Sequence, residues 1–351
     1  MKDLSSKERM NRLYNREKID RVPVLSCATM YAGWQKGLSS EEFYFSVEKA
    51  FWAQKEICDE GGFDDSPCYD LPHGERLDLG GELFIQQTER VALPLVKKFK
   101  IQSLEDAWNY ELPPVNERKF TKLQIEFLKY AETKGQFGVS ISAGSPFTMV
   151  GSMVETGAFM RWLAKEPDVV RHLLKIAIQY LSETADLMID EFGIEKCSVS
   201  SNYPFESNRL ISPRIFKKYA YPAMMEIHEK MRYKGLDNFG IHLCGSHNKN
   251  LEFFKDLNLP EGSFVSSDEE NSLKKVSEVL GKEKLYAGNV STKLLVEGTE
   301  KQVYQKSREI IEQMKYNKGG FILMPSCDLP INARPENLQA MLQASYDFGR
   351  Y

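Results

Sequence analysis

The sequence lacks the features that mark nucleic-acid-binding, membrane-spanning and exported proteins. Its 351 residues carry a formal net charge of −4, with no block or stripe of lysine and arginine, so nucleic acid and anionic membrane surfaces are not expected partners. No apolar run approaches the roughly 18 residues that a bilayer-spanning helix needs. The N-terminal stretch is charged throughout and has no apolar signal core, which predicts a cytoplasmic protein.

The cysteines and glycines also lack the spacing that would identify a disulfide framework or a nucleotide-binding loop. The six cysteines are scattered without the spacing of a disulfide framework. In a reducing compartment we expect free thiols, of which a clustered subset is a candidate metal site. No glycine-rich fingerprint opens a helix, which argues against a dinucleotide-binding fold. No internal repeat or low-complexity linker divides the chain.

One short stretch, Phe239–Cys244, combines a strand pattern with metal-binding side chains. It is mostly apolar and ends at Gly245, which predicts a buried strand followed by a loop. Residues two apart point to the same face of a strand. His242 and Cys244 are therefore expected to project side by side, with Leu243 on the opposite face.

A third candidate ligand, Cys327, follows another short apolar run at 321–324. One imidazole and two thiolates suit zinc, and three protein ligands leave one position open, as in catalytic zinc sites. A substrate thiol entering that position would lose its proton and become a nucleophile. The alternative is a core histidine with two inert buried cysteines. Spacing alone leaves both interpretations open.

Short apolar strands alternate with helical patterns along the whole chain. The alternation predicts a parallel sheet, and about eight strands predict an α/β fold: a (β/α)8 TIM barrel spanning 1–351 as a single domain, with an N-terminal helical extension. The expected strands are 22–25, a short one near 63, 137–144, 197–200, 239–244, 263–266, 285–287 and 321–324, with extended segments over 83–97. The expected helices begin near Ser5 and continue with 40–60, 121–134, 157–190 split at Pro167, 213–233 interrupted near Pro222, 251–257, 272–280, 300–316 and 335–348.

Polar residues gather just after the expected strands. In a barrel these positions meet at the carboxyl face, where active sites lie. The convergence favours the metal interpretation over three unrelated core residues. The residues concerned are Asp64, Asp65, Ser145, Asn202, His242, Cys244, Asp268, Asn289 and Cys327.

Several short motifs are distributed along nearly the whole chain. They are Asp20–Val24, Ser145–Thr148, Leu210–Pro213, His242–Gly245, Ala287–Val290 with Leu294–Leu295 and Gly298–Thr299, and Pro325–Cys327. Together they resemble the uroporphyrinogen decarboxylase superfamily, which implies a (β/α)8 barrel in agreement with the strand count. True decarboxylases of that superfamily grip porphyrinogen carboxylates with an arginine-rich loop after the first strand. The corresponding loop here, 26–31, contains no arginine, which argues against a tetrapyrrole substrate.

The His-x-Cys…Cys set instead resembles the cobamide-dependent methyltransferase branch, typified by methylcobamide:coenzyme M methyltransferases. The resemblance implies that His242, Cys244 and Cys327 bind Zn²⁺, which activates a thiol for attack on the methyl carbon of a methylcorrinoid. It also implies that an acid after the next strand can bind the zinc when no thiol is present. Asp268 is the catalytic candidate for this role, with Glu269 as the alternative. An ordinary loop role for Asp268 also stays open.

The substrate pocket is expected at the same face. Asp65, Asn202, Tyr203 and Asn289 are the candidate substrate-binding residues, with a polar loop role for Asp65 and a packing role for Tyr203 as alternatives. The implied co-substrate is a corrinoid of the methylcobalamin type. It is either free methylcobamide or carried by a separate corrinoid protein, because the chain shows no second domain and no Asp-x-His-x-x-Gly cobalamin-ligand motif. The other substrate is a small-molecule thiol such as coenzyme M, or a methylated compound if transfer runs in the opposite direction.

Two other functions stay open. A uroporphyrinogen decarboxylase-like enzyme acting on a tetrapyrrole carboxylate predicts no stoichiometric metal and turnover without cobalt. A corrinoid-binding or docking module with a degenerate site predicts tight cobalamin binding without methyl transfer. The intact ligand set argues against the module.

Overall fold

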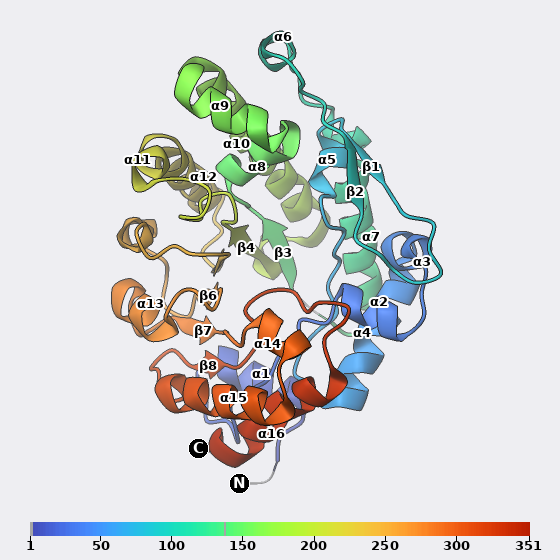
Figure 1. Cartoon of the computed structure of the whole chain (residues 1–351), viewed down its shortest axis with the longest axis vertical. Coiled ribbons are helices and arrows are strands. Elements are labelled where there is room, and N and C mark those ends of the chain that lie inside the picture. The colour runs from blue at the N-terminus through green and yellow to red at the C-terminus, as the bar shows by residue number, and fades with distance from the viewer. Residues whose placement is uncertain (1–2, 137) are drawn as a thin grey trace.

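A parallel sheet of six strands forms most of the barrel wall. The computed structural model describes residues 3–136 and 138–351. Its sheet order follows the chain order, from β3 to β8. Helices on the outside join each strand to the next (Figure 1). The strands are β3 (Val139–Ser142), β4 (Cys197–Asn202), β5 (Phe239–Leu243), β6 (Phe264–Ser267), β7 (Leu285–Ala287) and β8 (Phe321–Ile322).

Two N-terminal segments complete the barrel. Val24 forms a parallel bridge with Leu323, just past β8, and the Leu25 amide donates to the Leu323 carbonyl at 2.9 Å. The Asp64 amide in turn donates to the Val24 carbonyl at 2.8 Å. The segments 22–25 and 63–65 thus extend the six-stranded wall by two positions, in agreement with the expected α/β barrel.

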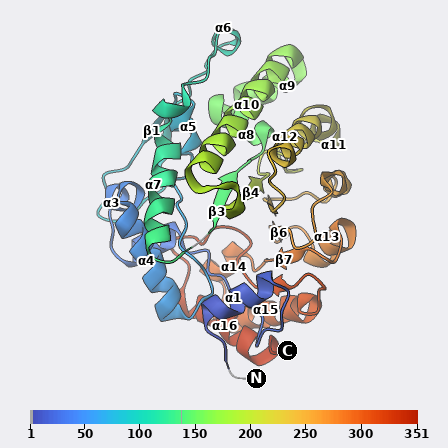
Figure 2. The same ribbon diagram turned by 180° about the vertical axis from the view of Figure 1, so that it is seen from behind.

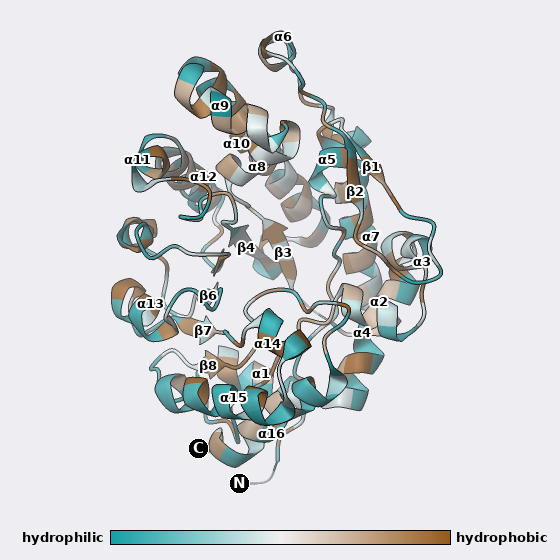
Figure 3. Ribbon diagram, viewed as in Figure 1, coloured by the Kyte–Doolittle hydropathy of each residue, from teal (hydrophilic) through white to brown (hydrophobic). Residues whose placement is uncertain are grey.

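The outer layer consists of amphipathic helices with well-defined starts. Capping boxes open α1, α3, α6 and α15, where a Ser or Thr side chain accepts from the third helical amide and the side chain there returns the bond. The outer face of α15 is largely hydrophilic (Figure 3), whereas Val303 and Ile311 are buried toward the barrel. The larger helices are α1 (Ser6–Tyr14), α4 (Val47–Gly61), α7 (Lys119–Thr133), α8 (Pro146–Met153), α9 (Thr156–Lys165), α10 (Pro167–Phe192), α12 (Tyr221–Tyr233), α13 (Leu273–Leu280), α15 (Glu300–Met314) and α16 (Pro335–Phe348). The shorter ones are α2 (Met30–Gln35), α3 (Ser40–Phe45), α5 (Glu75–Asp78), α6 (Leu104–Trp108), α11 (Pro213–Ile215) and α14 (Thr292–Glu297).

Proline positions the helix boundaries, as expected. The long helical stretch breaks at Pro167, where α9 ends and α10 begins, because proline is tolerated only in the first turn of a helix. The second expected interruption is a π-helical turn, η3 (Phe216–Ala220), directly before α12, and Pro222 lies in the first turn of α12.

Some expected segments differ in the structure. The extended region 83–97 is a two-stranded antiparallel hairpin of β1 (Glu82–Phe84) and β2 (Leu95–Lys98), separate from the barrel sheet. Residues 251–257 form a 3-10 helix rather than an α-helix. The expected strand from residue 137 begins outside the described residues, and β3 covers its described part. Helix α2 lies where only a loop was expected.

A buried network of ion pairs joins helix α1 to the first two barrel segments, 22–25 and 63–65. The Arg9 guanidinium is 2.7 Å from Asp20 Oδ1 and 2.7 Å from Asp64 Oδ1. Asp64 also accepts from the Val24 amide at 2.9 Å and pairs with Arg21 at 3.2 Å. Figure 2 shows α1 on the opposite side of the molecule from α14. The expected N-terminal helical extension therefore packs against the barrel at that side.

The outward-facing residues of the strands join the main core. They alternate along each strand with residues that face the barrel axis. The outward set packs in one cluster with the helices and includes Val139, Ile141, Val199, Phe239, Ile241, Leu243 and Val265.

The inward-facing residues divide into two unlike halves. One half is an apolar cluster of β6–β8 and the first barrel segment, closed by residues of the N-terminal extension: Leu13, Ile19, Leu25, Cys27, Phe264, Leu285, Ala287, Ile322 and Met324. The other half is the inner face of β3–β5. We call it the hydroxyl wall, and it consists of Ser140, Ser142, Ser198, Ser200 and Gly240, all half-buried or exposed.

Candidate metal centre

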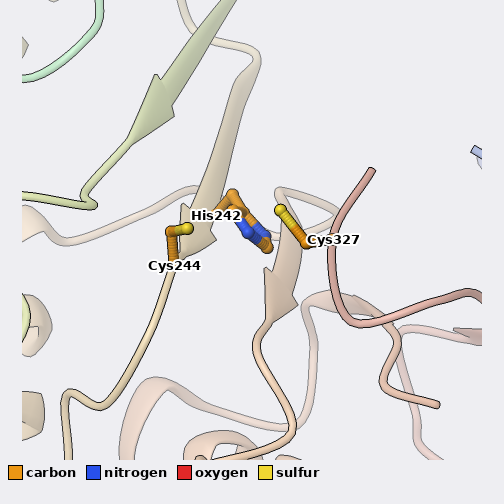
Figure 4. A group of neighbouring side chains, drawn as sticks. All are labelled: His242, Cys244 and Cys327. Atoms are coloured by element: carbon orange, nitrogen blue, oxygen red, sulfur yellow. The ribbon is translucent and has the colours of Figure 1, made fainter. Parts of the chain in front are cut away.

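Three potential metal ligands converge beyond the strand ends. His242 lies in β5, Cys244 follows it by two residues, and Cys327 comes from the loop after β8 (Figure 4). One ligand atom of each lies within 4.8 Å of the other two. Leu243 is fully buried on the outer face, so strand alternation places His242 and Cys244 on the same side, as expected. The barrel brings Cys327 to them across the ends of β6 and β7.

The His242 ring has one partnered and one unpartnered nitrogen. Its Nδ1 lies 2.9 Å from Ser266 Oγ, and Ser266 is the register partner of His242 on β6. Its Nε2 is buried and has no hydrogen-bond partner among the described residues. A buried polar atom without a partner is costly, and metal-binding histidines commonly use the other nitrogen for an orienting hydrogen bond. Nε2 is therefore the atom that fits a metal ion.

The two thiols interact with each other. A hydrogen bond from Cys327 lowers the pKa of Cys244, and the same contact raises the pKa of Cys327. The contact therefore favours the thiolate of Cys244 over that of Cys327. Both side chains are half-buried. The donor set of imidazole and two sulfurs, with an orphaned Nε2, fits zinc.

The two acidic residues that follow β6, Asp268 and Glu269, lie near the ligand cluster but do not belong to it. Burial raises the pKa of Asp268, whose Oδ1 accepts from the Glu270 amide at 2.9 Å. Burial opposes ionisation of Glu269, but hydrogen bonds from Ser326 and Ser291 lower its pKa. Neither carboxylate belongs to the group of ligand atoms within 4.8 Å in the described residues. A fourth-ligand role for Asp268 therefore remains a hypothesis.

Two further acids near the cluster received no role from the sequence. Asp328 is exposed and directly follows Cys327. Burial and the carboxylates of Asp328 and Glu75 raise the pKa of Asp70 to about 7. No lysine or arginine is among the groups that shift the pKa values of Asp70 and Asp328. Positive charge acts on the neighbouring acids: burial raises the pKa of Glu75 and the Arg76 charge opposes this rise, and Arg209 forms an ion pair with Glu270.

The four expected substrate-binding residues occupy different environments. Asp65 holds the loop after the first barrel segment, because its carboxylate accepts from the Ser26 amide at 2.6 Å and the Cys27 amide at 3.1 Å. Tyr203 is fully buried. Its hydroxyl lies 2.8 Å from His228 Nε2, behind the barrel wall.

The other two lie closer to the metal candidates. Asn202 is exposed at the end of β4 and is the register partner of His242. Asn289 is 7% exposed, and its Nδ2 donates to the Asp268 carbonyl at 3.1 Å and the Asn271 carbonyl at 2.9 Å. Of the four side chains, only that of Asn202 combines exposure with register pairing to His242.

A network of side-chain amides holds the loop that carries Cys244. Asn271 accepts from the His247 amide at 2.8 Å and donates to the Gly245 carbonyl at 2.8 Å. His247 Nε2 lies 3.1 Å from the Cys244 carbonyl. Asn289 binds the Asn271 carbonyl and so extends this network to the next loop. Sequence reasoning missed Asn271 and Ser266, because neither belongs to a motif with recognisable spacing.

The fold and the cluster together define a (β/α)8 barrel protein with a candidate metal centre at the carboxyl ends of its strands. The family model described as uroporphyrinogen decarboxylase (URO-D) matches residues 5–348, and the chain belongs to this family. No curated protein matches the chain.

Two solved structures share the fold. A methyltransferase from Methanosarcina mazei is 22% identical, with a TM-score of 0.76 and 99% of each chain covered. A B12-independent methionine synthase from Shewanella sp. W3-18-1, solved in complex with selenomethionine, is 12% identical, with a TM-score of 0.52, and 88% of this chain and 89% of that chain are covered. At these identities the likeness establishes the fold.

Described residues contain no helix that is both long and apolar enough to cross a membrane.

Proposed function

We propose that the chain is a zinc-dependent methyltransferase that moves a methyl group between a methylcorrinoid and a thiol. The observation that carries the proposal is the convergence of the His242 ring, whose buried Nε2 has no hydrogen-bond partner among the described residues, with the sulfurs of Cys244 and Cys327. The fold shared with the Methanosarcina mazei methyltransferase supports it. When bound, zinc would act as a Lewis acid that lowers the pKa of the substrate thiol at the fourth position.

The chain's own residues prepare this site in three ways. Ser266 fixes the His242 ring so that Nδ1 is occupied and Nε2 is left for a ligand. Asn271 fixes the backbone next to Cys244 by donating to the Gly245 carbonyl, and Asn289 donates in turn to the Asn271 carbonyl. We propose that Asp268, in the loop that follows β6, binds the zinc when no thiol is present and gives up that position to the substrate thiol. Alignment of the thiol and the methyl group would supply the rest of the rate.

The corrinoid is a substrate that approaches from the carboxyl face. It is free methylcobamide or carried by a separate corrinoid protein. Asn202, exposed beside His242, is the strongest candidate for contact with a substrate. Asp65 and Asn289 would shape the pocket through the loops they hold, and Tyr203 through packing. We place this activity in the cytoplasm and in a single domain over 1–351.

The first test is the metal content of the purified full chain. We expect close to one zinc per chain, and weakened zinc binding in Cys327→Ser. Cys68→Ser is the matched control, since Cys68 is exposed and outside the ligand cluster. Zinc absent from the wild-type protein after anaerobic purification and zinc addition would overturn the proposal. Equal zinc loss in both variants would also contradict the assigned ligands.

The family description keeps decarboxylation of a tetrapyrrole carboxylate as a second candidate. The loop 26–31 contains no arginine, so the bidentate carboxylate contacts that such a substrate needs are missing there. Turnover of a porphyrinogen by the zinc-free chain, without any corrinoid, would favour this candidate over methyl transfer.

A further inference from the structure

The hydroxyl wall lies directly beneath the candidate metal centre. Asn202 and His242 pair in register on β4 and β5, and two residues earlier Ser200 pairs with Gly240. Ser142 pairs with Ser200 on the other side. Two residues along a strand correspond to about 7 Å. Ser142, Ser200 and Gly240 therefore form a level of the wall about 7 Å below His242.

The hydroxyls of this level are available to a ligand. Ser142 and Ser200 are half-buried, and neither hydroxyl has a hydrogen-bond partner among residues 3–136 and 138–351. A Cβ at Gly240 would lie 3.6 Å from the Val199 carbonyl oxygen and 3.7 Å from Phe264 Cβ. These are ordinary van der Waals distances, so crowding does not require glycine there. The small side chains leave space that larger ones would fill.

The interior of a TIM barrel is usually filled by branched apolar side chains. The β6–β8 half of this barrel follows that rule with Leu285 and Ile322. The β3–β5 half departs from it on three adjacent strands. The departure is confined to the side of the barrel on which His242 lies, which links it to the candidate metal centre.

The hydroxyl wall offers no partner for a charge of either sign. The described strands β3–β8 contain no lysine, arginine, aspartate or glutamate. The carboxylates that act on Cys244 include those of Asp268, Asp328 and Glu206, which all lie in loops after the strands. A charged tail along the wall would therefore be buried without a counter-charge, which is strongly unfavourable.

We propose that the thiol substrate carries a short, uncharged, hydrogen-bonding tail that lies along the hydroxyl wall, with Ser142 and Ser200 as specificity-determining residues. The proposal rests on the proposed function and names the substrate class of the same site. A methylcorrinoid would occupy the open carboxyl face, so the tail of the thiol must point away from that face. The hydroxyl wall is the accessible polar surface on that side of His242.

The test compares three thiols that share one skeleton and differ in the terminal group. 2-Mercaptoethanol ends in a hydroxyl, cysteamine in an ammonium and 2-mercaptoethanesulfonate in a sulfonate. Their binding to the cobalt(II)-loaded full chain is measured by the sulfur-to-cobalt charge-transfer absorption. We expect 2-mercaptoethanol to bind about tenfold more tightly than either charged thiol. Tightest binding of the sulfonate or of the ammonium, or equal binding of all three, overturns the proposal.

Substitutions in the hydroxyl wall test whether the preference for the hydroxyl thiol depends on the open space beside Ser200 and Gly240. Ser200→Leu fills the level below His242 and is expected to abolish the preference for the hydroxyl thiol, while the d–d spectrum of the cobalt protein stays unchanged. Gly240→Ala provides a milder filling variant if Ser200→Leu does not fold. Ser198→Ala, one level farther from His242, is the control and should keep the preference. A preference that survives both filling variants overturns the assignment.

Failure of this inference is distinguishable from failure of the proposed function. A chain that binds no cobalt or zinc contradicts the proposed function. A chain that binds metal and thiols in a different order of affinity contradicts only the uncharged tail.

Discussion

The Ser266 hydroxyl lies 2.9 Å from Nδ1 of His242, across the register pair that joins β6 to β5. This relationship leaves only Nε2 for a ligand. A histidine with two free nitrogens can rotate or change tautomer, whereas this ring has one nitrogen engaged. The geometry of the candidate metal centre therefore depends on a residue that touches no metal.

Replacing Ser266 by alanine should weaken zinc binding by about tenfold, because the orienting hydrogen bond to His242 is lost. The measurement is competition with a zinc-binding dye. Ser267→Ala is the matched control, since Ser267 is the neighbouring residue, is 1% exposed and has a hydroxyl without a partner among the described residues. Equal zinc affinity in Ser266→Ala and wild type would show that the ring is held by other contacts.

Replacing Asn289 by alanine should lower the free energy of unfolding by about 1–3 kcal/mol, because the carbonyls of Asp268 and Asn271 lose their buried donor. Urea unfolding measures the change. Asn202→Ala is the control, because Asn202 is exposed and should change stability by less than about 0.5 kcal/mol. If Asn289 is mainly a substrate contact, substrate affinity falls while the unfolding curve stays in place.

Replacing Arg9 by methionine should destabilise the fold by about 3–5 kcal/mol, because two buried carboxylates, Asp20 and Asp64, lose their main counter-charge. Thermal and urea unfolding both report this loss. Arg16→Met removes an ion pair with Glu261 in which the two side chains are 44% and 65% exposed, and it should cost less than about 1 kcal/mol. Similar losses in the two variants would refute a dominant role for the Arg9 network.

Glu206 predicts a pH-dependent stability. It is fully buried, accepts hydrogen bonds from the Ser145 and Thr148 hydroxyls, and burial raises its pKa from 4.5 to about 8. The folded state thus holds the proton more firmly than the unfolded chain. The resulting stability is fully present below pH 4.5 and is lost as pH rises through about 8.

Glu206→Gln should flatten this dependence, because the amide mimics the neutral acid and does not ionise. Urea unfolding at about pH 5 and about pH 9 makes the comparison. We expect near-equal stability to wild type at the lower pH and higher stability at the upper pH. Glu252→Gln serves as control because the Glu252 side chain is 72% exposed. A wild-type chain with equal stability at both pH values would contradict the assigned protonation.

Patterns within single strands were sufficient to predict the metal candidates. Alternation put His242 and Cys244 on one face, and the apolar run before Cys327 indicated the strand that delivers it. The same alternation also predicts that Tyr203 faces outward, because it follows Val199 and Ser201 of β4 at intervals of two residues. Its position after a strand had suggested the pocket, yet its ring lies behind the wall against His228.

Contacts between strands were beyond prediction from local patterns. The pairing of Ser266 with His242 depends on register, which is set by twist and packing across the whole sheet. Asn271 lies directly after the acidic run 268–270 and gave no signal of its own. The hairpin of β1 and β2 was expected only as extended chain, because nothing in its composition showed that it would pair outside the barrel.

The closure of the barrel has a consequence for how the chain is made. Val24 bridges to Leu323, and the Val22 amide donates to the Gly349 carbonyl at 3.0 Å. A ribosome releases residues 22–25 long before their partners at 323 and 349 exist. During that interval the apolar edge of the first barrel segment is uncovered, and it can pair with the wrong strand of its own chain or of a neighbouring one.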